Sequence, residues 1–136
     1  MLILCYKLYE EQGIRLKTLR EKNNFKIHLE LVDDSATYSS LQKIVDDYYK
    51  EEKFLYLCLI GNEHEIPSYK TSYENNAMSD IKYGLKNDII QIFVGRITSG
   101  DSHYLNWSIS QSDRIQYVKN QIDKLHEYEN ISTDSQ

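Results

Sequence analysis

The segment FLYLCLI, residues 54–60, is the most hydrophobic run of the chain, and the turn-forming pair Gly61-Asn62 follows it directly. A short unbroken apolar run that stops at a turn is typical of a strand covered on both faces, as in the parallel sheets of α/β proteins. We therefore expect residues 54–60 to form the centre of a parallel sheet.

Other apolar segments on both sides of this strand alternate between strand and helix patterns. Residues 1–6, MLILCY, read as a second buried strand, and residues 25–32, FKIHLELV, alternate in polarity as a strand at or near an edge does. Residues 89–97, IIQIFVGRI, are expected to form the fourth strand. Helices are expected in three places. The first covers about residues 8–22, and the second follows a capping box formed by Ser39 and Gln42. The third carries the apolar stripe of Ile115, Val118, Ile122 and Leu125.

This alternation predicts the fold class. Three βα units with right-handed crossovers make a three-layer α/β sandwich, with a small, four-stranded, mainly parallel sheet in the order 2-1-3-4 and helices on both faces. The chain of 136 residues has room for one domain, which we place at residues 1–129, with residues 130–136 as a disordered tail. Residues 61–88 are too long for an ordinary connection, so we expect them to be functional, hairpin-forming or both.

Composition excludes several classes of partner. The 16 Lys and Arg residues are outnumbered by 21 Asp and Glu residues and form no basic stripe, which disfavours a nucleic-acid partner. No apolar run approaches the roughly 20 residues needed to cross a bilayer. The opening MLILCYKLYEE lacks a basic leader and a cleavage site, so it does not read as a signal peptide. We expect a soluble chain without a membrane partner. The sequence does not predict its cellular compartment.

No catalytic residue is predicted. Cys5 and Cys58 lie inside apolar runs, where cysteine is usually a small buried hydrophobe of raised pKa, and a disulfide is the weaker alternative. His28 and His126 are expected on outward faces, and His103 lies in a polar stretch without a cysteine nearby. No pairing of a nucleophile with a base emerges from this pattern.

The turn after the central strand is the candidate ligand site. Glu63, His64 and Glu65, together with Asp88, offer carboxylate and imidazole ligands beyond the carboxyl end of a strand, where open α/β sheets bind ligands. Consecutive side chains in a turn diverge, however, and no HxxxH or HExxH spacing is present. The chain also lacks the glycine-rich phosphate loops. We therefore expect no metal and no cofactor, with calcium as the weaker alternative.

Three blocks carry a resemblance to a known family: FLYLCLIGNEHEIP (54–67), SDIKYG (79–84) and IQIFVGRI (90–97), with IDKLHEYENI (122–131) similar to the helix that follows. In this order they resemble the first half of the catalytic domain of the gingipain-type cysteine peptidases, which has a caspase-like fold. Two departures stand out: Asn62 replaces the usual Asp after the strand glycine, and residues 98–113 are longer than the family's connection. The residues that match the family pattern are Gly61, Pro67, Ser79, Asp80, Tyr83, Gly84, Gly95 and Arg96.

The resemblance implies a supporting role. In this family the catalytic His, in a Gly-His-Gly segment, and the catalytic Cys lie in a second caspase-like subdomain, and this chain contains neither feature. It implies a non-catalytic subdomain, inactive alone, that braces a second, catalytic subdomain or another protein. Two alternatives stay open: a stand-alone pseudo-enzyme interaction module, and a small metal- or ligand-binding α/β domain. Arg96 is expected either to pair with Asp80 or Asp88 or to be exposed.

Overall fold

The central strand of the sheet is β3 (Tyr56–Ile60), which lies between β1 (Leu2–Tyr6) and β8 (Phe93–Ile97). The strand β2 (His28–Val32) pairs with β1 and forms the opposite edge. In this computed structural model, which describes residues 1–70, 78–100 and 109–134, these three pairings are all parallel. The order β2-β1-β3-β8 confirms the predicted order, with β8 as the fourth strand.

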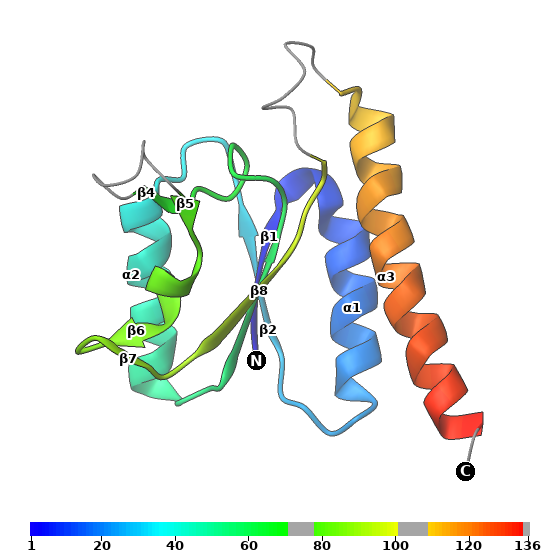
Figure 1. Cartoon of the computed structure of the whole chain (residues 1–136), viewed down its shortest axis with the longest axis horizontal. Coiled ribbons are helices and arrows are strands. Elements are labelled where there is room, and N and C mark those ends of the chain that lie inside the picture. The colour runs from blue at the N-terminus through cyan, green and yellow to red at the C-terminus, as the bar shows by residue number, and fades with distance from the viewer. Residues whose placement is uncertain (71–77, 101–108, 135–136) are drawn as a thin grey trace.

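Helices cover both faces of this sheet. On one face lies α2 (Tyr38–Glu51); on the other lie α1 (Glu10–Glu21), which follows the short η1 (Lys7–Tyr9), and α3 (Gln111–Asp134) (Figure 1). Side chains of β3 alternate between two cores: Leu57 and Leu59 pack on the α2 side, whereas Cys58 and Ile60 pack on the α1 and α3 side. The three-layer α/β architecture is therefore confirmed. No helix in the described residues combines the length and apolar character needed to cross a membrane.

The start of α2 differs from the prediction. The N-cap is Thr37, whose hydroxyl accepts a hydrogen bond from the Ser40 backbone N–H at 3.1 Å, while the Ser40 hydroxyl accepts one from the Thr37 N–H at 2.9 Å. The predicted capping box of Ser39 and Gln42 is wrong. Both positions precede the same apolar stripe, Leu41 and Val45, so periodicity does not separate them.

The long connection after β3 contains two hairpins. The strands β4 (Tyr69–Lys70) and β5 (Met78–Ser79) pair antiparallel, as do β6 (Leu85–Lys86) and β7 (Ile89–Ile90), and η2 (Ile81–Gly84) lies between the hairpins. The prediction that this connection forms hairpins is thus confirmed.

The fourth strand of the sheet begins at Phe93 and not at Ile89, contrary to prediction. Ile89–Ile90 pair with β6 through a tight turn in which Asn87 and Asp88 both have positive φ angles. The close approach of the end of η2 to Ile92, the residue before β8, requires glycine at position 84, because a Cβ there would lie 2.0 Å from the carbonyl oxygen of Ile92.

The last helix continues further than expected. The predicted apolar stripe is present, with Val118 and Ile122 buried and Ile115 and Leu125 partly buried against the core. The helix runs to Asp134, so helical structure extends into residues 130–134, which had been assigned to a disordered tail. The domain boundary at residue 129 stays a prediction.

Candidate functional site

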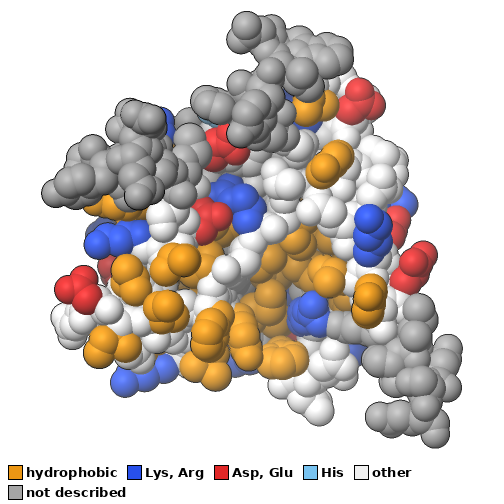
Figure 2. All heavy atoms as spheres, in the orientation of Figure 1, with side chains coloured by type: hydrophobic (Ala, Val, Ile, Leu, Met, Phe, Trp, Pro, Cys, Tyr) orange, Lys and Arg blue, Asp and Glu red, His pale blue; other side chains and the backbone are white. Residues whose placement is uncertain are grey.

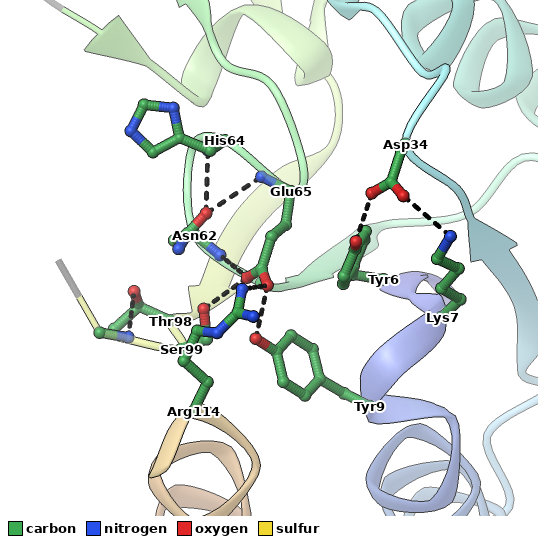
Figure 3. Close-up of polar contacts among 12 residues, drawn as sticks. Tyr6, Lys7, Tyr9, Asp34, Asn62, His64, Glu65, Thr98, Ser99 and Arg114 are labelled. Carbon is green, nitrogen blue, oxygen red and sulfur yellow. Dashed lines mark hydrogen bonds and ion pairs between the residues drawn. The ribbon is translucent and has the colours of Figure 1, made fainter. Parts of the chain in front are cut away.

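The candidate site lies at the carboxyl ends of β1, β3 and β8. The turn that follows β3 lies there beside η1 and the first turn of α3 (Figure 3). This is the end of a parallel sheet at which ligands bind in open α/β proteins.

The turn is organised by Asn62. Its side-chain oxygen accepts hydrogen bonds from the backbone N–H groups of His64, at 2.9 Å, and of Glu65, at 3.0 Å, and its carbonyl accepts one from the Ile66 N–H at 2.8 Å. The preceding Gly61 has φ of +143°, a conformation that side chains rarely adopt. Asn62 is buried and closes the turn through a neutral amide oxygen. A carboxylate at position 62 is therefore not needed to form this turn.

Glu65 is the centre of a buried polar network, which Figure 3 shows. Its side chain is only 5% exposed. One carboxylate oxygen accepts from the Asn62 backbone N–H at 2.9 Å and from the Ser99 hydroxyl; the other accepts from the Tyr9 hydroxyl at 2.6 Å and from Arg114 Nη1 at 2.8 Å. Burial, followed by the hydrogen bond to Glu65, raises the pKa of Tyr9. Glu65 therefore serves as an internal acceptor that joins four segments of the chain.

The other predicted ligands do not gather around Glu65. The His64 imidazole is 62% exposed and lies 3.9 Å from the carboxylate of Glu63. Asp88 is exposed in the β6–β7 turn, which precedes the amino end of β8, whereas residues 63–65 follow the carboxyl end of its parallel neighbour β3. Within residues 1–70, 78–100 and 109–134, no group of three or more His, Cys, Asp or Glu side chains is placed to hold a metal ion.

A second polar cluster lies after β1. The Lys7 ammonium lies 2.9 Å from a carboxylate oxygen of Asp34, and the Tyr6 hydroxyl donates to the other oxygen. The hydrogen bond to Asp34 and then burial raise the pKa of Tyr6 to about 12, whereas the hydrogen bonds from Tyr6 and Lys7 lower the pKa of Asp34. The Lys7 and Asp34 side chains are exposed, so this cluster links the ends of β1 and β2 at the surface.

Arg96 of β8 holds the long connection to the sheet. Its Nε and Nη2 atoms donate to the two carboxylate oxygens of Asp80, each at 2.8 Å. Its guanidinium also donates to the carbonyls of Gly61 and Ile66, at 3.0 and 2.9 Å, and to the Ser68 hydroxyl at 3.0 Å. The Arg96 side chain is only 15% exposed, so the alternative of an exposed arginine is wrong. Arg96 instead pairs with Asp80, and we call this group of contacts the Arg96 clamp. Burial opposes ionisation of Asp80, but hydrogen bonds from Arg96 and Ser68 outweigh it and lower its pKa.

Other residues of the family-like pattern extend this clamp. The Tyr83 hydroxyl donates to the carbonyl of Pro67, and Ser79 pairs with Tyr69 in the β4–β5 hairpin. These contacts tie residues 67–69 to residues 79–83. Gly95 is different, because it lies on the exposed edge strand of the sheet.

The two thiols are buried in the core beneath the helices, and Cys58 also borders a groove beside β8. Cys5 and Cys58 are free cysteines, so the alternative of a disulfide between them is wrong. Both are buried in the core under α1 and α3, and desolvation is the main cause that raises the pKa of each to about 12. The Cys5 thiol donates to the Tyr9 carbonyl at 3.3 Å. Neither thiol has the exposure or ionisation of a nucleophile, and His103 lies outside the described residues.

Sequence reasoning missed four residues of these networks: Tyr9, Ser68, Ser99 and Arg114. Tyr9, Ser99 and Arg114 meet Glu65 across 56, 34 and 49 positions of sequence. Their residue types and spacings carry no signal for such long-range contacts, which depend on how the elements pack.

Comparison with known proteins gives a consistent result. The model of Peptidase family C25 matches residues 1–136. Two solved structures are similar, each with a TM-score of 0.66 and 22% identity over 90% of this chain: a complex of Porphyromonas gingivalis RgpB pro- and mature domains, and the Arg-specific cysteine proteinase gingipain R (RGPB). The match covers 28% and 27% of those chains, so this chain spans about a quarter of their length. No curated protein matches.

Proposed function

Because this chain belongs to peptidase family C25, we propose that it is a non-catalytic subdomain that braces a second, catalytic, caspase-like subdomain of a gingipain-like cysteine peptidase. The fold shared with gingipain R over about a quarter of that protein's chain supports a role as one part of a larger peptidase. The whole enzyme's proteolytic activity would then reside in the partner subdomain.

The observation that carries this proposal is that the polar groups at the carboxyl end of the sheet are bonded to one another. In an enzyme with this architecture, that end holds reactive groups facing an opening. Here both carboxylate oxygens of Glu65 are engaged by donors of the chain itself, and the two thiols are buried with raised pKa values. These contacts stabilise the positions of the turn, β8 and α3, as a scaffold requires, and leave these groups unsuited to chemistry.

A peptidase assay on the isolated chain tests the absence of catalysis. With fluorogenic arginyl peptides and a reducing agent, we expect no thiol-dependent hydrolysis. In other words, no peptidase activity should be present that disappears when the thiols are alkylated. Iodoacetamide should modify Cys5 and Cys58 slowly in the folded chain and rapidly in urea, because unfolding removes the desolvation that raises their pKa. Thiol-dependent hydrolysis that disappears in Cys58→Ala would show that the chain is itself a peptidase.

A second experiment tests the bracing role. Reading the gene beyond codon 136 should reveal a Gly-His-Gly segment and a cysteine after a later strand. In the longer polypeptide, replacing that cysteine by Ala should abolish peptidase activity, whereas Cys58→Ala should retain it. A gene that stops at codon 136 would contradict the proposal of a covalently linked catalytic subdomain.

A further inference from the structure

A group of exposed hydrophobic side chains lies at the β8 edge of the sheet. The members, whose exposed fractions lie between 45% and 62%, are Phe25, Leu55, Tyr56, Ile89, Ile90 and Phe93, and we call them the β8 patch. Figure 1 views the molecule with β8 in front of β1 and β2, and the space-filling view in the same orientation shows hydrophobic side chains over β7 and β8 (Figure 2). Their exposure together needs a physical reason, because large apolar patches on a monomer mark interaction sites.

The members of the β8 patch are adjacent in the structure. Tyr56 and Phe93 are in register on neighbouring strands, and their rings stack with centroids 6.0 Å apart. Both rings line a groove of about 440 Å³, together with Phe25 and Gly95. The Phe93 N–H donates to the Leu55 carbonyl at 2.8 Å, and β7 ends three residues before Phe93. The patch therefore combines a groove with a flanking hairpin in one surface.

The opposite edge of the sheet is protected by charge. Beside β2, the Lys26 ammonium lies 2.9 Å from a carboxylate oxygen of Glu52, and the His28 imidazole lies 3.7 Å from the same oxygen. Charged side chains at an edge strand discourage association with another surface. In β7 and β8 the one charged side chain is Arg96, which is largely buried in the Arg96 clamp. The β8 edge therefore lacks this protection, which suits an edge that another surface covers.

The area of the β8 patch matches one side of a standard protein interface. With about 200 Å² for each aromatic side chain, the exposed parts of the three aromatic members amount to roughly 300 Å². With about 100 Å² for each Leu or Ile side chain, as the transfer free energies of these residues imply, the three aliphatic members add roughly 170 Å². An interface that covers about 800 Å² of each partner, of which about 57% is apolar, contains about 460 Å² of apolar surface on each side. The patch can therefore form the apolar part of such an interface.

We propose that the β8 patch is the surface on which the second, catalytic subdomain docks; this inference rests on the proposed function. The two broad faces of the sheet are already covered, one by α2 and the other by α1 and α3 (Figure 1), so a further subdomain can reach the sheet at an edge. The chain spans about a quarter of the gingipain structures that it matches. A subdomain joined to it by a linker would be present at a high effective concentration, and an interface of standard size is then sufficient.

The groove defines the chemistry of the partner surface. Its described lining contains aromatic rings and Arg20 but no acidic side chain. An apolar side chain that projects from the partner can enter the groove without burying a carboxylate of this chain, whereas a lysine or arginine would find no acidic partner there. We therefore expect the docking surface of the catalytic subdomain to present an aliphatic or aromatic side chain to the groove.

Hydroxyl-radical footprinting followed by mass spectrometry tests this docking surface. Two samples are compared: the isolated chain of residues 1–136, and the longer polypeptide that continues into the catalytic subdomain. We expect the oxidation of Tyr56 and Phe93 to fall several-fold in the longer polypeptide, because side chains at the core of an interface are fully buried. Leu31, which is exposed on β2, is the control and should be oxidised equally in both samples.

A charge placed in the β8 patch should prevent docking. In the longer polypeptide, Phe93→Lys should restore the oxidation of Tyr56 to the level of the same variant in the isolated chain. The thermal midpoint of the isolated chain should change little, because the Phe93 ring is 62% exposed. Ile90→Lys, on β7, gives the same test without a substitution in β8. Leu31→Lys, at an exposed position on the opposite edge strand, is the matched control and should change neither measurement.

The docking surface is overturned if Tyr56 and Phe93 are oxidised as strongly in the longer polypeptide as in the isolated chain. If that polypeptide still hydrolyses peptides, the proposed function stands and another surface carries the catalytic subdomain. The inference is also overturned if the isolated chain is already protected at high concentration and the longer polypeptide adds no protection, which would assign the patch to a second copy. A gene without the Gly-His-Gly segment and the later cysteine overturns both this inference and the proposed function.

Discussion

At the scale of single residues, Arg96 contributes contacts that no other residue type can supply. A planar guanidinium donates in several fixed directions, which suits a bidentate pair with Asp80 and further bonds to two carbonyls and a hydroxyl. Lysine has a single ammonium group and cannot reproduce this arrangement. Arg96 thereby links the turn after β3, the Ile66–Ser68 segment and Asp80 to the edge strand.

We expect Arg96→Met to lower the free energy of unfolding by about 3 kcal/mol, because it leaves a largely buried carboxylate without its partner. Urea denaturation followed by circular dichroism measures the change. Arg96→Lys should restore only part of the loss. Lys43→Met, which removes an exposed ion pair with Asp47, is the control and should have no measurable effect. An equal effect of the Arg96 and Lys43 substitutions would show that the clamp does not stabilise the fold.

At the scale of elements, the start of α2 shows why the capping box predicted from the sequence, Ser39 with Gln42, is wrong. The first turn of a helix has backbone N–H groups without partners inside the helix, and a side chain placed before the helix satisfies them. In the structure Thr37 and Ser40 satisfy two such groups reciprocally. The Gln42 amide instead donates to the carbonyl of Tyr83 at 3.1 Å, which links α2 to η2.

Thr37→Ala should therefore lower the free energy of unfolding by about 1 kcal/mol, as expected for loss of an N-cap. Ser39→Ala, at an exposed position two residues later, should have little effect. The same urea titration compares the two variants. A larger loss for Ser39→Ala than for Thr37→Ala would place the cap where the sequence pattern alone had suggested.

At the scale of the whole molecule, acid should destabilise the fold through carboxylates that are hydrogen-bonded in the native state. The folded-state pKa of Asp80 lies below its ordinary value of 3.8, so its stabilising contribution is complete above that value. The contribution is lost as the pH falls from about 3.8 through the lowered pKa of the folded state. We expect the free energy of unfolding to decrease over this interval.

Asp80→Asn should reduce this pH dependence while lowering stability at pH 7, because the neutral amide does not titrate and pairs less strongly with Arg96. Asp47→Asn is the control: the pKa of Asp47 is lowered by its hydrogen bond to Lys43, but the pair is exposed and screened by water. Urea titrations at pH 7, 5 and 3 measure how the free energy of unfolding depends on pH for the wild-type chain and for each of the two variants. An unchanged pH dependence for Asp80→Asn would contradict the assignment of acid sensitivity to the pair of Asp80 and Arg96.

The parts of the fold that periodicity controls were predictable. The unbroken run at 54–60 and the stripe containing Val118 and Ile122 indicate which parts of these elements are buried. The alternation at 25–32 did not indicate the buried face, because Phe25 and Leu31 are exposed and the strand begins only at His28. Strand order and the three-layer architecture follow from these patterns and from the handedness of parallel crossovers. The start of β8 and the N-cap of α2 were predicted wrongly, because both depend on local pairing that leaves the apolar pattern unchanged.

Sequence by itself therefore determined the α/β class, the central strand, the family resemblance and the burial of Cys5 and Cys58. Tertiary structure alone decided the hydrogen-bond partners of Glu65, which the sequence presents as a ligand in a turn and the fold encloses with donors from η1, α3 and the segment after β8. It also decided that Arg96 pairs with Asp80 and that Gly95 faces an open groove. The physical reason is that burial follows from periodicity along one element, whereas a polar group's partners are set by where separate elements meet.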